Sequence, residues 1–374
     1  MPQALIAGHC DKAFAAVGHA FERCFTELGE TGAGICAVVG GRPVVDLWGG
    51  LADPASGHVW RRNTLVHVYS VSKPFAAICL LLLADRGAVD LDAPVARYWP
   101  EFGQAGKAEI PVRWLLTHQA GLVGLRRPLD AAAIYDWDRI AQTLAEEEPW
   151  WKPGTCHGEH AWFYGHLVGE VVRRVSGRSI GAYLRDAVAG PWNIDFHFGL
   201  TAPDAARCAT VTGLDGDWLA EKRIPGDSMY ARALGNPPGL LSGAIINSAA
   251  WRRAEFPAIN GHGSARGVAR LYAGLAAGGT LGGRRLLSSE MVAQAVSVQT
   301  AGLDLLLERH VSWGFGVQIE PDGFGMAGVG GSLGWGSVEH DFGFAYVTAH
   351  MADHDRALAC YRSLADTLGF AVDP

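Results

Sequence analysis

The sequence predicts an α+β fold, an α/β sandwich around a central antiparallel sheet, with a large and mostly helical insertion. Strand patterns occur near the start of the chain and again from Trp313 onward, whereas helical patterns dominate the long middle. A sheet assembled from both chain ends is the simplest architecture for this order. We expect residues 1–72 and 280–374 to form the α/β domain, residues 73–279 a mostly helical domain, and a functional site in the cleft between them.

Hydrophobic spacing predicts the N-terminal elements. Five apolar residues recur at helical spacing: Phe14, Val17, Phe21, Phe25 and Leu28. They predict an amphipathic helix that packs on a sheet. The next segment, GICAVVGGRPVVDLWGG at residues 34–50, is typical of two apolar strands around a Gly-Gly-Arg-Pro turn.

The spacing of apolar residues differs between the middle of the chain and its C-terminal part. HLVGEVVRRVSG and SARGVARLYAGLAAGG are helical patterns, and no Rossmann-like alternation of strands and helices surrounds them. WGFGVQIE, FGMAGVGGSLGWGS and DFGFAYVTAH then predict strands. The final helix, DHDRALACYRSLADTLG, is expected beside the first, so that the terminal helices flank the sheet.

Composition excludes several classes of protein. The 374 residues are 49% hydrophobic and 18% charged, which indicates a globular chain. A net charge of -7 with scattered arginine pairs disfavours nucleic-acid binding. Seven cysteines without a C-x-x-C pair disfavour a disulfide framework or a zinc finger. The longest apolar run is too short to span a membrane, and the N-terminus lacks a signal-peptide pattern. We therefore expect a cytoplasmic protein. The sequence does not determine its oligomeric state.

The segment VYSVSKPFAAICLLLLADRG, residues 68–87, places Ser70 and Lys73 one turn apart on one face of an apolar helix. A serine becomes nucleophilic when a neighbour takes its proton, and a lysine can do so if burial lowers its pKa. Pro74 fits a helix start. The same S-x-x-K pattern also occurs as an N-cap serine followed by a solvated lysine, so its surroundings must decide between the two.

Those surroundings resemble the serine β-lactamase and DD-peptidase superfamily, in the branch of class C β-lactamases and family VIII carboxylesterases. The resemblance rests on YSVSKPFAAICLLLLADRGAVDLDAPVARYWPEF with VRWLLTHQAGL, and on later segments in the same order, including WWKPGTCHGEHAWFYGHLVGEVVRRVSGRS and FGMAGVGGSLGWGS. It implies a β-lactamase-like fold, a nucleophilic Ser70, a Lys73 that shuttles its proton, and an acyl-enzyme. It implies no cofactor.

A second serine motif lies in the strand region. Gly330-Gly331-Ser332-Leu333-Gly334 matches G-x-S-x-G, which works as a nucleophile elbow only on a strand-to-helix turn. Here another strand is expected to follow. The resemblance instead places Met326-Ala327-Gly328 on the strand beside the site, with the Val329 and Ser70 amides as an oxyanion hole. Family members carry Lys, His or Trp where this chain has Met326, so a donor for a substrate carboxylate is missing.

The third catalytic group of the family is a tyrosine, and this chain departs from it. Counting back from Gly169 aligns Glu159 with that tyrosine; a shorter register would align His160. Glutamate is the weaker base but is ionised at neutral pH, and the two effects roughly cancel, so Glu159 is a plausible general base. A carboxylate there would also hold Lys73 in its charged form. The alternative is an ion pair that leaves the site slow or inactive.

Other marked residues complete the expected site. Six residues are expected to bind substrate: Tyr69, Trp151, His160, Trp162, Met326 and Gly328. Cys156, His157, Glu159 and His160 could hold a metal with His166 as a further ligand, but no zinc signature is present and we expect no metal. His118 and His262 are expected to order loops by hydrogen bonds.

The sequence therefore predicts a serine hydrolase of the carboxylesterase type that cleaves a small ester or lactone. Its expected catalytic residues are Ser70, Lys73 and Glu159. Transfer of the acyl group to a small alcohol or amine is a close alternative, which differs only in what attacks the acyl-enzyme. A repurposed or inactive member that binds a ligand in the cleft is the second class. A true β-lactamase is disfavoured because Met326 replaces a cation.

Overall fold

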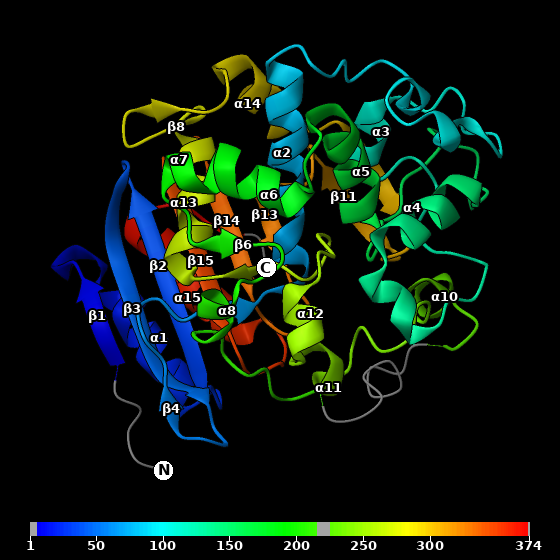
Figure 1. Ribbon diagram of the computed structural model, residues 1–374. Helices are drawn as coiled ribbons and strands as arrows, with labels where there is room; N and C mark the ends of the chain where they lie inside the picture. Colours follow the sequence, from blue (N-terminus) through cyan, green and yellow to red (C-terminus); the bar gives the residue numbers. More distant parts are fainter. Residues whose placement is uncertain (1–5, 215–224, 373–374) are drawn as a thin grey trace.

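The computed structural model describes residues 6–214 and 225–372 (Figure 1). Residues 1–5, 215–224 and 373–374 of the expected domain ranges lie outside this description. Among the helices of the described ranges, none has both the length and the apolar character needed to cross a lipid bilayer.

The ten-stranded sheet takes its strands from both ends of the chain. Its N-terminal strands are β1 (Ile6–Cys10), β2 (Gly32–Val39), β3 (Arg42–Asp53) and β4 (His58–Val59). Its C-terminal strands are β10 (Thr300–Asp304), β11 (Arg309–Trp313), β12 (Gln318–Glu320), β13 (Gly323–Ala327), β14 (Leu333–Ser337) and β15 (Phe342–Thr348). The order is β1-β3-β2-β15-β14-β13-β12-β11-β10, antiparallel throughout, and β4 pairs with β3. The two groups meet where β2 pairs with β15, which confirms the predicted fold class.

Helices cover both faces of the sheet. Helices α1 (Ala15–Thr26) and α15 (Asp355–Leu368) pack together on one face, as predicted (Figure 1). Their apolar residues form one core cluster with the sheet, including Phe21, Phe344 and Leu364. On the other face, α13 (Ala265–Ala276) packs on β2, β14 and β15 although it falls within the range 73–279. The division into two domains stays a prediction.

The remaining helices lie between β4 and β10. They are α2 (Lys73–Asp85), α3 (Val112–Leu116), α4 (Trp137–Glu146), α5 (Tyr164–Ser176), α6 (Ile180–Leu184), α7 (Gly190–Trp192), α8 (Ala202–Ala205), α10 (Met229–Leu234), α11 (Gly243–Ile246), α12 (Ala249–Arg253) and α14 (Ser289–Ala295). Short strands form two small sheets: β5 (Val66–His67), β6 (Phe196–His197) and β7 (His262–Gly263) in one, and β8 (Thr280–Leu281) with β9 (Arg284–Arg285) in the other.

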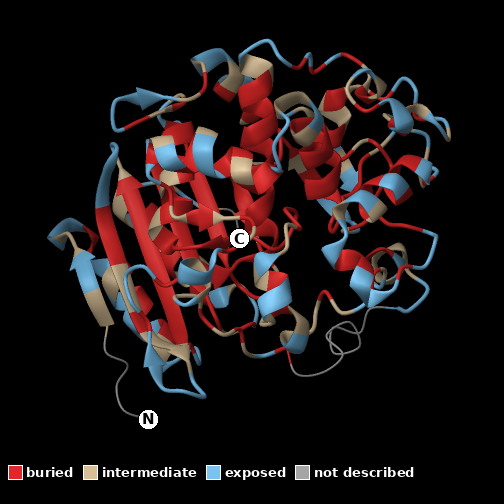
Figure 2. Cartoon of the chain, in the orientation of Figure 1, coloured by how far each residue is buried: buried red, intermediate tan, exposed pale blue. Residues whose placement is uncertain are grey.

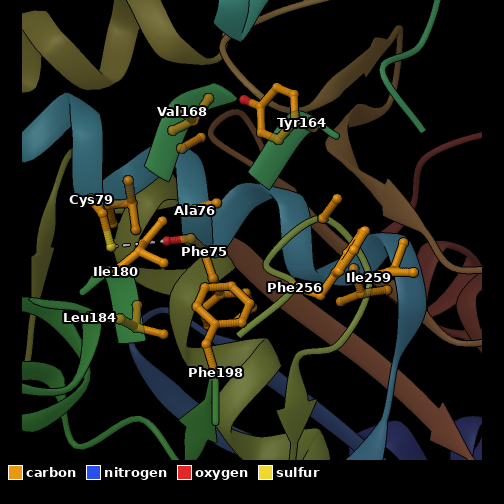
Figure 3. Packing of buried hydrophobic residues seen from close by; sticks show 14 of the residues in the cluster. Phe75, Ala76, Cys79, Tyr164, Val168, Ile180, Leu184, Phe198, Phe256 and Ile259 are labelled. Atoms are coloured by element: carbon orange, nitrogen blue, oxygen red, sulfur yellow. Dashed lines mark hydrogen bonds between the residues drawn. The ribbon is translucent and has the colours of Figure 1, made fainter. Parts of the chain in front are cut away.

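Helix α2 runs through the interior, and its residues are buried on every side from Lys73 to Leu83 (Figure 2). Figure 3 shows Phe75 and Cys79 on α2 packed among side chains such as Ile180 and Phe256. The Phe75 ring stacks on Phe196 with centroids 3.5 Å apart. A helix that is apolar on every face is stable only when it is buried. Burial therefore holds the first turn of α2, which carries Lys73, in one position.

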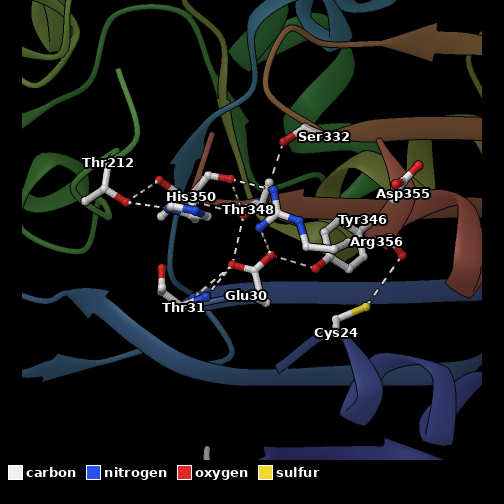
Figure 4. A network of polar contacts seen from close by, with 12 residues as sticks. Cys24, Glu30, Thr31, Thr212, Ser332, Tyr346, Thr348, His350, Asp355 and Arg356 are labelled. Carbon is white, nitrogen blue, oxygen red and sulfur yellow. Dashed lines mark hydrogen bonds and ion pairs between the residues drawn. The ribbon is translucent and has the colours of Figure 1, made fainter. Parts of the chain in front are cut away.

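A buried polar network ties α15 to the sheet (Figure 4). The Glu30 carboxylate accepts hydrogen bonds from the Arg356 guanidinium at 2.8 Å, the Tyr346 hydroxyl at 2.7 Å and the Thr348 hydroxyl at 3.0 Å. Arg356 also donates to the His350 carbonyl at 2.7 Å. Both charged side chains are almost wholly buried, so each depends on the other for compensation.

Replacing Arg356 by methionine should lower the free energy of unfolding by about 3–5 kcal/mol, because the Glu30 charge would stay buried without its cation. Chemical denaturation measures this loss. The control is Glu27→Ala, which breaks the exposed Arg23–Glu27 pair and should leave stability nearly unchanged. If both variants lowered the free energy of unfolding by the same small amount, the network would not stabilise the fold.

Candidate active site

Ser70 lies on a 3₁₀ turn, Tyr69–Ser72, that leads directly into α2. The turn begins at Tyr69, whose φ of 46° is left-handed, and the Lys73 amide donates to the Ser70 carbonyl. Ser70 and Lys73 are therefore three residues apart on one helical surface, as the S-x-x-K spacing predicts.

Three side chains meet at this turn. The Lys73 ammonium nitrogen, Nζ, lies 2.6 Å from Ser70 Oγ and 2.9 Å from Glu159 Oε1. Among the described residues, no hydrogen bond joins Glu159 directly to Ser70. Lys73 therefore stands between the hydroxyl and the carboxylate.

Burial controls the electrostatics of this group. Lys73 has no exposed surface, whereas Ser70 keeps 8% and Glu159 keeps 7% of theirs. Burial lowers the pKa of Lys73 below its ordinary value, against the opposing effect of the Glu159 charge. The amine can thus give up a proton more readily than a surface lysine.

The loop that carries Glu159 is held against the His118 backbone and ring. The Gly158 amide donates to the His118 carbonyl at 3.1 Å, and the His160 amide donates to His118 Nδ1 at 3.0 Å. Burial and neighbouring positive groups lower the pKa of His118 well below its ordinary value, so the ring stays neutral and Nδ1 can accept. His118 orders this loop as predicted.

The edge of β13 closes the other side of Ser70. A Cβ added to Gly328 would lie 2.2 Å from the Val68 carbonyl oxygen and 3.4 Å from the Ser70 nitrogen. Gly328 therefore permits a close backbone approach between the end of β13 and this turn, while the role of the Val329 amide stays a prediction. The Met326 side chain is buried in an apolar cluster with Val311 and Trp313.

The other expected substrate-binding residues are largely enclosed. The Tyr69 hydroxyl donates to the Leu240 carbonyl at 3.1 Å, and the Trp162 indole donates to the Leu234 carbonyl at 2.9 Å. His160 is wholly buried, and burial together with the Lys73 charge lowers its pKa to about 3. Their roles toward a substrate stay predictions.

Trp151 supports the Glu159 loop from its apolar side. Its indole N–H donates to the Cys156 carbonyl at 3.2 Å, and a Cβ at Gly158 would lie 2.7 Å from its ring. Two surface hollows of the described part are lined by other residues, one between α4 and α12 and one around Arg62 and Asp195. The cleft expected at Ser70 stays a prediction.

Sequence reasoning missed the segment around α10. Tyr69 and Trp162 both bond backbone carbonyls that follow Tyr230 in this segment. Burial, and to a smaller extent the Glu159 charge, raise the pKa of Tyr230 to about 12. Only the contacts of Tyr69 and Trp162 in the folded chain reveal this segment, because nothing in the local pattern of α10 marks it.

Two alternative sites can be compared with the structure. Ser332 precedes β14 rather than a helix and accepts from the Thr348 amide at 3.3 Å, so the strand predicted after it is confirmed. In residues 6–214 and 225–372, no group of three or more His, Cys, Asp or Glu side chains is arranged to hold a metal ion. His157 instead faces the Thr300 hydroxyl at 3.2 Å.

The chain is similar to known proteins over nearly its whole length. A family model described as Beta-lactamase matches residues 21–368. The chain is 33% identical over 377 residues to "Esterase/beta-lactamase LipL" of Mycobacterium tuberculosis (strain ATCC 25618 / H37Rv), which covers 95% of this chain and 84% of the relative.

Solved structures agree with this. A family VIII carboxylesterase is 35% identical with a TM-score of 0.89, covering 97% of this chain and 100% of the other. A penicillin-binding protein homologue from Caulobacter crescentus is 33% identical with a TM-score of 0.86, again covering 97% and 100%.

Proposed function

Because this chain belongs to the beta-lactamase family, we propose that it is a serine hydrolase of the carboxylesterase type that cleaves a small ester or lactone through an acyl-enzyme on Ser70. One observation carries the proposal: Lys73 Nζ lies 2.6 Å from Ser70 Oγ and 2.9 Å from Glu159 Oε1. This is a continuous path for a proton from a nucleophile to a base.

Acylation follows from this path. Ser70 Oγ forms a bond to the ester carbonyl carbon while its proton passes to Lys73, which gives one of its own protons to Glu159. The carbonyl oxygen becomes an oxyanion and accepts hydrogen bonds from the Ser70 and Val329 amides. When the ester C–O bond breaks, Glu159 returns the proton through Lys73 to the leaving alcohol.

Deacylation repeats the same steps with water. Water attacks the acyl carbonyl carbon, its proton passes through Lys73 to Glu159, and the bond to Ser70 breaks as Ser70 Oγ takes a proton back. A small alcohol in place of water would give acyl transfer by the same path. Lys73 and Glu159 would thus handle the protons together, with Lys73 as the group in contact with Ser70.

The β13 strand supports an ester over a substrate with a carboxylate near the reacting carbonyl. Met326 offers no cation at this point and is buried among Val311 and Trp313. A β-lactam carboxylate would lose solvation there without gaining a charged partner. Neutral esters and lactones avoid this cost.

Covalent labelling tests the proposal. Wild-type protein should hydrolyse a chromogenic short-chain ester and gain the mass of a phosphonate probe on a peptide that contains Ser70. Ser332→Ala is the matched control, because it removes the G-x-S-x-G serine and should leave both results unchanged. A protein that neither hydrolyses the ester nor takes up the probe would be the repurposed binding member instead.

Glu159→Gln should lower kcat at neutral pH by about 10²–10³-fold, since the proton acceptor behind Lys73 is lost. The residual activity should rise with pH, because only a neutral Lys73 amine can then accept the Ser70 proton. Burial lowers the pKa of Lys73, so the rise should be complete below the ordinary lysine value of 10.5. A pH–rate profile of both proteins checks this; unchanged kcat would assign Glu159 to structure.

Gly328→Ala should lower kcat by about 10²-fold, because the new methyl group would push the end of β13 and the Val329 amide away from Ser70. Gly18→Ala, in helix α1, is the control, because its methyl group would lie 3.5 Å from the nearest atom, the Cys10 sulfur. Steady-state kinetics with both variants measures the difference. Equal kcat values would show that β13 does not supply the oxyanion donor.

A further inference from the structure

Asp304, at the end of β10, is a wholly buried carboxylate that the mechanism above does not use. Its Oδ1 accepts hydrogen bonds from the amides of Glu159 at 3.1 Å, Leu306 at 3.0 Å and Leu307 at 2.9 Å. Its Oδ2 accepts from the Trp313 indole at 3.0 Å. One side chain therefore joins a hairpin of the sheet to the backbone of Glu159, 145 residues away.

The same hairpin holds the residues before Glu159. His157 pairs with Asp304 in a short parallel bridge, and the Leu305 amide donates to the His157 carbonyl at 3.0 Å. His157 Nδ1 also lies 3.2 Å from the Thr300 hydroxyl. The Glu159 loop is thus added to the outer edge of β10, the last strand of the sheet.

A second route reaches the loop through an aromatic contact. The Trp313 indole that bonds Asp304 packs edge-to-face on His118, with ring centroids 4.3 Å apart. His118 in turn binds the amides of Gly158 and His160, on either side of Glu159. Asp304 therefore holds Glu159 directly and also steadies the ring that holds its neighbours.

The donors explain why this residue is a carboxylate. All four partners are N–H groups, and a carboxylate offers only acceptors. An asparagine keeps one oxygen and places an NH₂ group where the other stood, so either the Trp313 indole or the three amides would face a donor. A misplacement of about 1 Å at a reacting group costs on the order of 10²-fold in rate.

We propose that Asp304 is a positioning residue that fixes the Glu159 carboxylate within proton-transfer distance of Lys73. The inference rests on the proposed function, in which Glu159 accepts a proton from Lys73. It assigns a role in turnover to the β10–β11 hairpin, which carries none of the reacting groups.

The test compares Asp304→Asn, Glu159→Gln and the double variant. Asp304→Asn should lower kcat for a chromogenic ester by about 10- to 100-fold and leave KM within about twofold. The double variant should be no slower than Glu159→Gln alone, since a residue that acts through Glu159 has nothing left to position. Glu170→Gln is the matched control: Glu170 is equally buried and accepts from the Trp137 indole at 2.7 Å. It should leave kcat within about twofold.

Each other outcome has a clear meaning. If Glu159→Gln is slow but Asp304→Asn is as fast as wild type, or the two losses multiply, the role of Asp304 is wrong and the proposed function stands. If Glu159→Gln itself is fully active, the role of Glu159 as proton acceptor and the positioning role of Asp304 are both wrong. Should Asp304→Asn fail to fold, Trp313→Phe removes only one donor to Asp304 and should give a smaller kcat loss, of about 3- to 10-fold, that disappears in the Glu159→Gln background.

Discussion

Ser70→Ala should lower kcat/KM for a short-chain ester by about 10⁴–10⁶-fold, the range seen when a serine nucleophile is removed. In the proposed mechanism the hydroxyl forms the acyl-enzyme, and among the residues that the structure describes no second hydroxyl or thiol is hydrogen-bonded to Lys73. The side chain is small and 8% exposed, so its loss should hardly affect folding. The same variant should gain no mass from a phosphonate probe.

Two controls make this result specific. Ser72→Ala removes a buried serine on the same turn, whose hydroxyl accepts from the Gly261 amide at 2.9 Å, and it should keep the probe reaction. Thermal unfolding of each variant shows that the fold is retained. Labelling of Ser70→Ala at wild-type rate would mean that another nucleophile carries the reaction.

Lys73→Met should lower kcat by about 10³–10⁴-fold, because it removes the amine that contacts both Ser70 and Glu159. Methionine has a similar volume and no charge, so the interior around α2 stays filled. The variant should also be less stable, since the nearly buried Glu159 carboxylate would lose its cationic partner.

The Lys73→Met/Glu159→Gln double variant separates these two effects. It should recover stability, because no uncompensated charge remains, and it should stay as slow as Lys73→Met. Chemical denaturation and steady-state kinetics on the same samples measure both quantities. Recovery of activity in the double variant would contradict a role for Lys73 in proton transfer.

Hydrophobic spacing was sufficient to predict much of the fold. The terminal helices and strands β2, β3, β13, β14 and β15 are strongly apolar, and their periods are clear. Strand β1 and the β10–β11 hairpin lie at the two ends of the sheet, with β1 and β10 as its edge strands, and they were missed because they carry exposed polar residues and glycines such as Gly8 and Gly302. Edge strands bury less apolar surface, so their hydrophobic pattern is weak.

In the candidate site, too, local contacts could be predicted from the sequence, whereas contacts between distant segments could not. The contact between Ser70 and Lys73 follows from i, i+3 spacing on one turn, so sequence alone could predict it. The position of Glu159 needed the family resemblance. Asp304 could not be found, because its contacts with Glu159 join segments that only the folded sheet brings together.

The pairing of β2 with β15 also constrains how the protein can be made. Glu30 and Arg356, which meet beside these strands, are 326 residues apart in the chain. During synthesis the early strands leave the ribosome long before their partner strands are made, so the edge of β2 that later pairs with β15 stays unpaired until then. Such distant pairing slows folding, and we expect the nascent chain to depend on chaperone binding until its last helix emerges.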